Sequence, residues 1–154
     1  MRIPSYFRSK FRHGFTLIEL LLVIGIIAIL ASIVIVAINP TKQLGDARDA
    51  QRRSDVNSIL NAVYQYAIDN NGILPTDIST TSTEICDAAT TRGADCTDID
   101  LAVLTGAYLV AIPEDPQNLT STGTNYFISK DVRGRITVVA PGTEQADEDI
   151  SVTR

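Results

Sequence analysis

One carboxylate, Glu19, stands in an otherwise apolar stretch near the N-terminus of this 154-residue chain. The residues that follow it, 20 to 38, are nineteen in a row without a charged side chain. By membrane-insertion scales, a charge within a membrane helix costs about 2.5 to 3.5 kcal/mol at the helix centre. Glu19 therefore needs a cationic partner, or it lies at the edge of the apolar stretch and reaches toward water.

The pair Gly14-Phe15 marks the point where basic residues give way to apolar ones. Because every charge before residue 15 is basic, the positive-inside rule predicts that residues 1 to 14 stay in the cytoplasm and that the rest faces outward. Glycine has no side chain to obstruct an extended backbone in a protease cleft, so this bond suits a cleavage site. An ordinary loop glycine ahead of a helix is the alternative. The basic residues are Arg2, Arg8, Lys10 and Arg12.

The only two cysteines, Cys86 and Cys96, lie in the part expected outside, where oxidising conditions allow a disulfide that closes a short loop. Two free thiols are the alternative. A structural zinc site is not expected, because two cysteines without a nearby histidine do not fill a tetrahedral shell.

The composition argues against two function classes. Beyond residue 14 the chain has 18 acidic residues and nine Lys and Arg, a side-chain charge of −9, so no direct contact with nucleic acid is predicted. The single histidine is His13, and neither a phosphate-binding glycine loop nor a nucleophile elbow is present. The sequence therefore predicts that the protein is not an enzyme.

Two helical segments must position these residues. Residues 15 to 38 are long enough to cross a bilayer as a helix, and Asn39-Pro40 is the first helix breaker. Residues 39 to 70 form the amphipathic continuation, with a helix stop at Asn70-Asn71-Gly72. Its apolar stripe consists of Leu44, Ala47, Val56, Ile59, Leu60, Val63, Ala67 and Ile68.

The remainder, 71 to 154, is expected to be an extracytoplasmic head. Residues 76 to 98 are typical of a surface loop, and a short helical turn is predicted near 99 to 107. The runs 126 to 130 and 135 to 140 predict a β-hairpin, and the acidic tail from residue 144 is expected to be solvated or frayed. The predicted fold is α+β, a long helix packed on a small antiparallel β-sheet.

The stretch Arg12-His13-Gly14-Phe15-Thr16-Leu17-Ile18-Glu19-Leu20 resembles the N-terminal signal of type IV pilins and type II secretion pseudopilins. The resemblance implies a pilin-like fold, and cleavage after Gly14 by a prepilin peptidase that methylates the new terminus at Phe15. It also implies that Glu19 of one subunit meets the terminal amine of a neighbour. One departure is Val36, where many type IV pilins have proline.

A second stretch, Tyr108-Leu109 through Ile112-Pro113-Glu114-Asp115-Pro116, looks like a motif of major pseudopilins. In those proteins the following loop binds calcium, and Asp115, Asn118 and Asp131 are oxygen ligands that fit such a site. The W-G-N-P-Y continuation of the family is replaced here by Gln117-Asn118-Leu119-Thr120. No cofactor is required, and calcium is the one metal that the resemblance allows.

The sequence thus predicts a structural subunit of a pilus-like or pseudopilus filament. The implied partners are prepilin peptidase, other copies or related pilin subunits, an inner-membrane assembly platform, and lipid before assembly. The chain would cross the inner membrane once and then enter the filament. The signal does not separate a pilus, a secretion system and a competence system.

The alternative function is that of a membrane-anchored extracytoplasmic binding domain that does not polymerise. A secretory signal peptide is disfavoured, because the apolar run is long and ends without a small-residue cleavage site.

Overall fold

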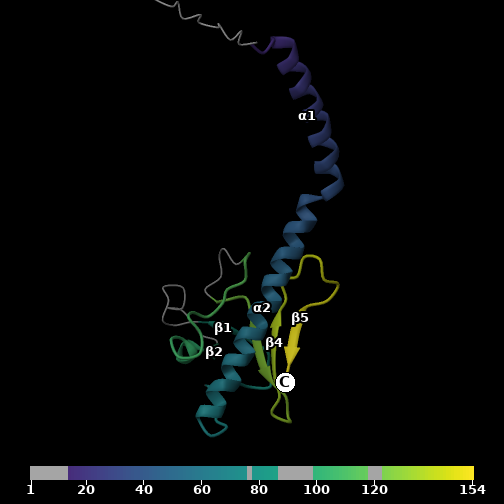
Figure 1. Cartoon of the computed structure of the whole chain (residues 1–154). Coiled ribbons are helices and arrows are strands. Elements are labelled where there is room, and N and C mark those ends of the chain that lie inside the picture. The colour runs from purple at the N-terminus through teal and green to yellow at the C-terminus, as the bar shows by residue number, and fades with distance from the viewer. Residues whose placement is uncertain (1–13, 76–77, 87–98, 118–122) are drawn as a thin grey trace, which may run out of the picture. The chain divides into compact units, whose positions relative to one another are not determined.

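The computed structural model describes residues 14–75, 78–86, 99–117 and 123–154 (Figure 1). These residues separate into two compact units, Met1–Pro40 and Thr41–Arg154, and each is described by itself.

The first unit consists of helix α1, Leu17–Ile38, in which no residue is buried. Its start is fixed by Thr16, whose extended backbone and hydroxyl cap the helix. Its end is fixed by Asn39, which takes the left-handed conformation at φ 47°. Among the described residues, α1 is the one helix long and apolar enough to cross a membrane. The predicted helix over 15 to 38 is confirmed, two residues shorter at its start.

Helix α2, Pro40–Asp69, belongs to the second unit from its second residue on. Proline is tolerated at the first helical position because the amide there has no partner within the helix. The helix ends as predicted, since Gly72 adopts φ 86° and donates its amide to the carbonyl of Ala67 at 2.7 Å.

The strands described are β1 (Thr83–Cys86), β2 (Ile99–Asp100), β3 (Phe127–Lys130), β4 (Ile136–Ala140) and β5 (Ile150–Thr153). They form one sheet in the order β2-β1-β3-β4-β5. The hairpin of β3 and β4 confirms the prediction, and the 3₁₀ turn η2 (Ala102–Leu104) lies within the predicted helical turn. Gly134, at φ 87°, makes the tight connection between β3 and β4.

The sheet corrects three expectations. It is mixed rather than antiparallel, because β1 and β2 pair in parallel and the twelve residues between them are enough for such a connection. The segment 76 to 98 contains β1 and is not loop throughout. The tail is not frayed, because β5 pairs with β4 from Thr137↔Thr153 to Ala140↔Ile150, but residues 147 to 149 are exposed, as expected of a partly solvated tail.

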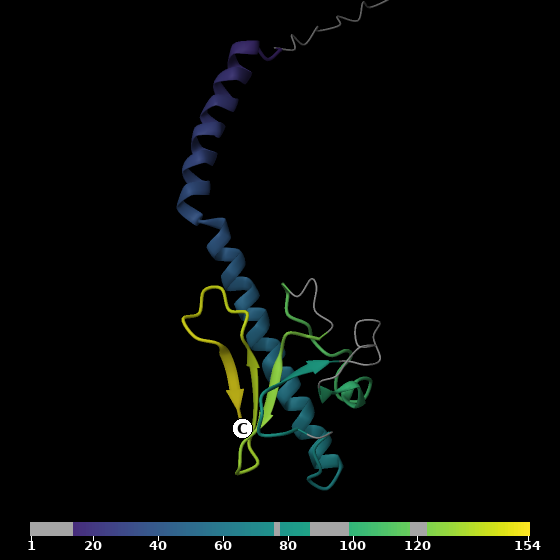
Figure 2. The ribbon, with the colours of Figure 1, turned by 180° about the vertical axis from the view of Figure 1, so that it is seen from behind.

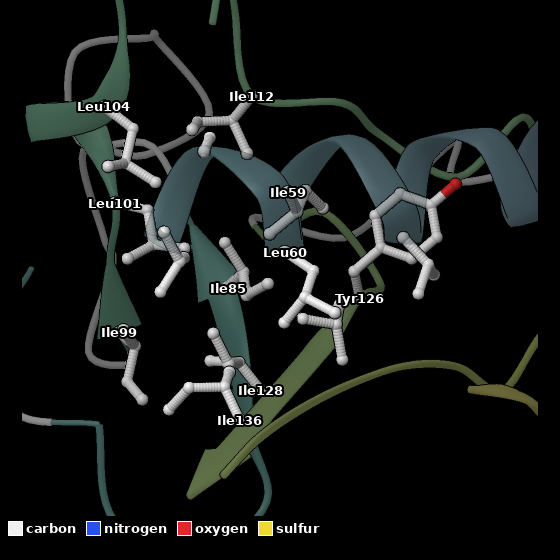
Figure 3. Packing of buried hydrophobic residues seen from close by; sticks show 14 of the residues in the cluster. Ile59, Leu60, Ile85, Ile99, Leu101, Leu104, Ile112, Tyr126, Ile128 and Ile136 are labelled. Atoms are coloured by element: carbon white, nitrogen blue, oxygen red, sulfur yellow. The ribbon is translucent and has the colours of Figure 1, made fainter. Parts of the chain in front are cut away.

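One face of the sheet packs against α2, as Figures 1 and 2 show from opposite sides. Val56, Ile59, Leu60 and Val63 recur at helical spacing and are fully buried. Figure 3 shows Ile59 and Leu60 against Ile85 and Ile128 of the sheet. The core closes around them with Ile78, Ile99, Leu101, Leu104, Ile112, Tyr126, Ile136, Val138, Ala140 and Ile150.

The predicted apolar stripe of the helix is wrong in its first turns and at its last position, Ile68, which is exposed. Leu44 and Ala47 are exposed, and the buried positions there are Gly45, Asp49 and Arg52. The reason is the loop after β4, which lies on this part of α2. A side chain at Gly45 would meet Cγ of Gln145 at 2.9 Å.

Candidate assembly and processing site

Residues 14 to 16 form an exposed, non-helical lead into α1. Phe15 is 80% exposed, and an added Cβ on Gly14 would meet nothing within 4 Å. Thr16 is extended, with ψ 151°. The backbone at the Gly14–Phe15 bond is therefore open, as a protease requires of a bond it cleaves. Residues 1–13, which include the basic leader, lie outside the described residues.

Glu19 is held at the start of α1 by Thr16. Oε2 of Glu19 accepts hydrogen bonds from the Thr16 amide at 2.8 Å and from its hydroxyl at 2.7 Å. The Glu19 amide in turn donates to the Thr16 hydroxyl at 3.3 Å. This is a capping box, in which two side chains satisfy the unpaired amides of the helix start.

The capping box leaves part of the carboxylate available. In the described residues no hydrogen bond is made to Oε1 of Glu19, and the residue is exposed. Glu19 is therefore oriented by its own helix and keeps one oxygen free for a cation. The sequence singled out Glu19 but missed the part played by Thr16, although Thr-x-x-Glu ahead of an apolar run is the pattern of a capping box.

A second polar cluster lies in the second unit, around Arg52 of α2. This guanidinium is fully buried, and it binds Asp115 through Nε at 2.6 Å and through Nη2 at 3.1 Å. Its Nη1 reaches Asp49 at 2.8 Å and Glu144 at 3.3 Å. Hydrogen bonding to Asp115 is the largest effect, and it raises the pKa of Arg52 above its ordinary value against the opposing effect of burial.

Asp49 connects this cluster to the loop after β4. Burial opposes its ionisation, but the amides of Gln145, Glu144 and Ala146 and the Arg52 side chain outweigh it and lower the pKa of Asp49. Glu144 also forms a two-point ion pair with Arg48, which lowers the pKa of Glu144. The cluster thus fastens the loop and the segment around Asp115 to α2. Sequence reasoning missed it, and the i,i+3 spacing of Asp49 and Arg52 is the only local signal.

Of the residues expected to hold calcium, the two that the structure describes are already paired with arginines, and the site itself stays a prediction. Asp115 is bound by Arg52 and by the Gln117 amide at 2.8 Å. Asp131 accepts from the amides of Arg133 and Arg135 and from Nε of Arg135, which together lower its pKa. No group of three potential metal-binding side chains occurs among the described residues. Asn118 lies outside them.

Cys86, the last residue of β1, is 1% exposed and pairs in register with Asp100 of β2. Cys96 lies outside the described residues. The expected bond between these two cysteines therefore stays a prediction.

Comparison with known proteins confirms the resemblance inferred from the N-terminal stretch. Residues 9–35 match a family model described as the prokaryotic N-terminal methylation motif. The chain is 40% identical over 68 residues to the type II secretion system core protein G of Pectobacterium carotovorum subsp. carotovorum. The aligned stretch is 44% of this chain and 42% of that relative, so the chain matches less than half of its length. No solved structure matches the chain significantly.

Proposed function

We propose that this chain is the precursor of a structural subunit that assembles into a type IV pilus-like or type II secretion pseudopilus filament. The observation that carries the proposal is α1, a 22-residue apolar helix without a single buried residue. Such a surface is stable only in lipid or against other apolar helices. The methylation motif and the partial identity to core protein G, which is a secretion-system protein, support the same reading.

In the proposed pathway residues 1 to 14 stay inside and α1 enters the cytoplasmic membrane. Prepilin peptidase hydrolyses the Gly14–Phe15 bond, which leaves a carboxylate on Gly14 and a protonated α-amino group on Phe15. Methylation of this amine keeps it basic. The open surroundings of Gly14 and the exposure of Phe15 are the features of the chain that suit it to this step.

Assembly then replaces lipid around α1 with the α1 helices of other subunits. The amine of Phe15 in one copy approaches Glu19 in another, where Oε1 has no hydrogen bond from its own helix. In low dielectric an ion pair of this kind favours the register in which both charges are satisfied. The second unit, Thr41–Arg154, remains outside the membrane and forms the filament surface. From here on, we call this whole unit the head. An inner-membrane platform would extract the subunits.

The first test is the N-terminal mass of the protein recovered from membranes of a host that has prepilin peptidase. The wild type is compared with Gly14→Leu and with Gly25→Leu, a glycine within α1 that also has open space around it. We expect a mature terminus at Phe15 in the wild type and in Gly25→Leu, and an intact leader in Gly14→Leu.

An uncut wild-type chain would contradict the proposal and leave a membrane-anchored binding domain that does not polymerise. Cleavage at another bond, unaffected by Gly14→Leu, would indicate an ordinary secretory signal instead.

A further inference from the structure

The β4–β5 pair gives the head two distinct ends. The pairing is antiparallel, so the β3–β4 turn and Arg154 lie at one end, and the loop between β4 and β5 lies at the other (Figure 2). We call residues 130–135 with Arg154 the turn end, and residues 144–149 the loop end. The five residues of β4 separate them by about 17 Å.

The turn end is basic, and most of its cationic side chains have no ion-pair partner among the described residues. Arg135 is paired with Asp131, and Arg154 donates to Asn61 at 2.6 Å. In the part of the chain that the structure describes, the side chains of Lys130 and Arg133 form no ion pair. Asn61 is neutral, so three cationic side chains at this end, Lys130, Arg133 and Arg154, have no carboxylate partner among the described side chains.

The loop end is acidic, and most of its carboxylates have no ion-pair partner among the described residues. Glu144 is committed to Arg48 and Arg52. Asp147, Glu148 and Asp149 are consecutive and exposed, and none forms an ion pair with the described residues. Arg53 lines the same surface as these three carboxylates without pairing with them. One cation is too few to neutralise the loop end.

An apolar groove adjoins the basic charges of the turn end. It lies between the last turns of α2 and the β3–β4 turn, and its walls include Ala67, Ile68, Leu74 and Lys130. Ile68 is 77% exposed, and Val132 at the tip of the turn is 93% exposed. Contact with another protein surface would cover these apolar side chains, which are exposed to solvent in the isolated head.

We propose that the turn end of one head docks against the loop end of a second copy of this chain, with Lys130 and Arg133 facing Asp147, Glu148 and Asp149. Both complementary surfaces are carried by the same chain, at opposite ends of β4. Such a contact uses two different patches, so it repeats head to tail and extends into a helical array when the rotation does not close. The inference rests on the proposed filament and names a second contact within it, outside α1.

The test uses charge reversal in the full chain, in a host with the complete assembly machinery. The variants are Arg133→Glu, Asp149→Lys, and the two combined. Asp46→Lys is the control, because it makes the same charge change as Asp149→Lys at an exposed position of α2 outside both ends. Filament yield is measured at equal membrane levels of processed subunit, so that folding and cleavage are held constant. Each single reversal is expected to lower the yield roughly tenfold, because it places like charges opposite each other. The combination is expected to restore it, and Asp46→Lys to leave it unchanged.

The failures can be told apart. Wild-type subunits that are processed but form no filament would overturn the proposed function and this contact with it. Wild-type filaments that Arg133→Glu and Asp149→Lys leave intact would overturn the contact alone. Reversals that weaken assembly without rescue by the combination would point to a different subunit as partner and overturn the pairing between copies.

Discussion

Nε of Arg52 donates to Oδ2 of Asp115 across 2.6 Å, and the two residues, 63 positions apart in the chain, are both closed off from solvent. The same guanidinium holds Asp49 and Glu144, so one side chain of α2 anchors two segments that come much later in the sequence. The head is therefore held together by this ion cluster as well as by its apolar core.

We expect Arg52→Met to destabilise the head by about 3–5 kcal/mol, because it leaves the carboxylates of Asp49 and Asp115 buried without their cation. The measurement is urea unfolding of the full chain in detergent, followed by tyrosine fluorescence. Arg53→Met, the exposed neighbour, is the control and should change the free energy of unfolding by less than about 0.5 kcal/mol. Equal effects of the two variants would contradict the role given to Arg52.

The same cluster predicts acid sensitivity. The pKa values of Asp49 and Glu144 are lowered from their ordinary values of 3.8 and 4.5. Groups whose pKa is depressed on folding stabilise the protein above the pKa of the unfolded state and lose that contribution as pH falls through the folded value. The midpoint of urea unfolding should thus be flat above about pH 5 and should fall below about pH 4.5. Asp49→Asn should flatten this acid limb, and an unchanged limb in that variant would count against the assignment.

Calcium is expected to leave the stability of the head unchanged. Arg52 already neutralises Asp115, and Arg135 already neutralises Asp131, so neither carboxylate gains much from a divalent cation. The test compares the thermal midpoint in excess EDTA with that in millimolar calcium, with magnesium as the control. A rise specific to calcium would show that the loop containing Asn118 completes a site, since a ligand that binds only the folded state raises its stability.

Local features could be predicted from the sequence, and pairings between distant segments could not. The break between α1 and α2 follows from Pro40 and the end of α2 from Gly72, and the cap at Thr16, although missed, is equally local in its pattern. The β3–β4 hairpin is likewise local. The backbone amides that bind Asp49 lie 95 to 97 positions away, and no sequence period marks them.

The misplaced stripe of α2 has the same cause. Leu44 and Ala47 satisfy the helical spacing of a buried face, but the loop after β4 covers Gly45 and Asp49 instead. β5 was missed for a related reason, because its four residues follow an acidic run and depend on β4 for their pairing. Tertiary contact decided both, and propensity did not.

We expect Cys86 and Cys96 to be joined in the protein recovered from the oxidising side of the membrane. The intact mass without reduction should be lower by about two hydrogens, and an alkylating reagent should label the denatured chain only after reduction. Cys86→Ser and Cys96→Ser should lower the thermal midpoint by similar amounts, because either removes the same constraint on the unfolded chain. Alkylation of both cysteines before reduction would contradict this pairing.

The relation between Thr16 and Glu19 leads to separate predictions for the two residues in assembly. Glu19→Gln keeps a side chain able to accept from the Thr16 amide but removes the charge. Subunits should therefore be inserted and cleaved normally, while filament yield should fall by tenfold or more. That fall corresponds to the loss of about 1.4 kcal/mol or more of ion pairing.

Thr16→Ala removes the hydroxyl cap but keeps the Glu19 charge and the hydrogen bond that Glu19 accepts from the residue 16 amide. It should therefore cost only about 1 kcal/mol of helix stability and cause a smaller loss of filaments. Thr16→Ser retains the hydroxyl and serves as the matched control. Yields are compared at equal amounts of processed subunit in the membrane. If Thr16→Ala proved as damaging as Glu19→Gln, capping rather than pairing between subunits would be the main role of Glu19. If Glu19→Gln assembled like the wild type, the carboxylate would have no part in setting the register.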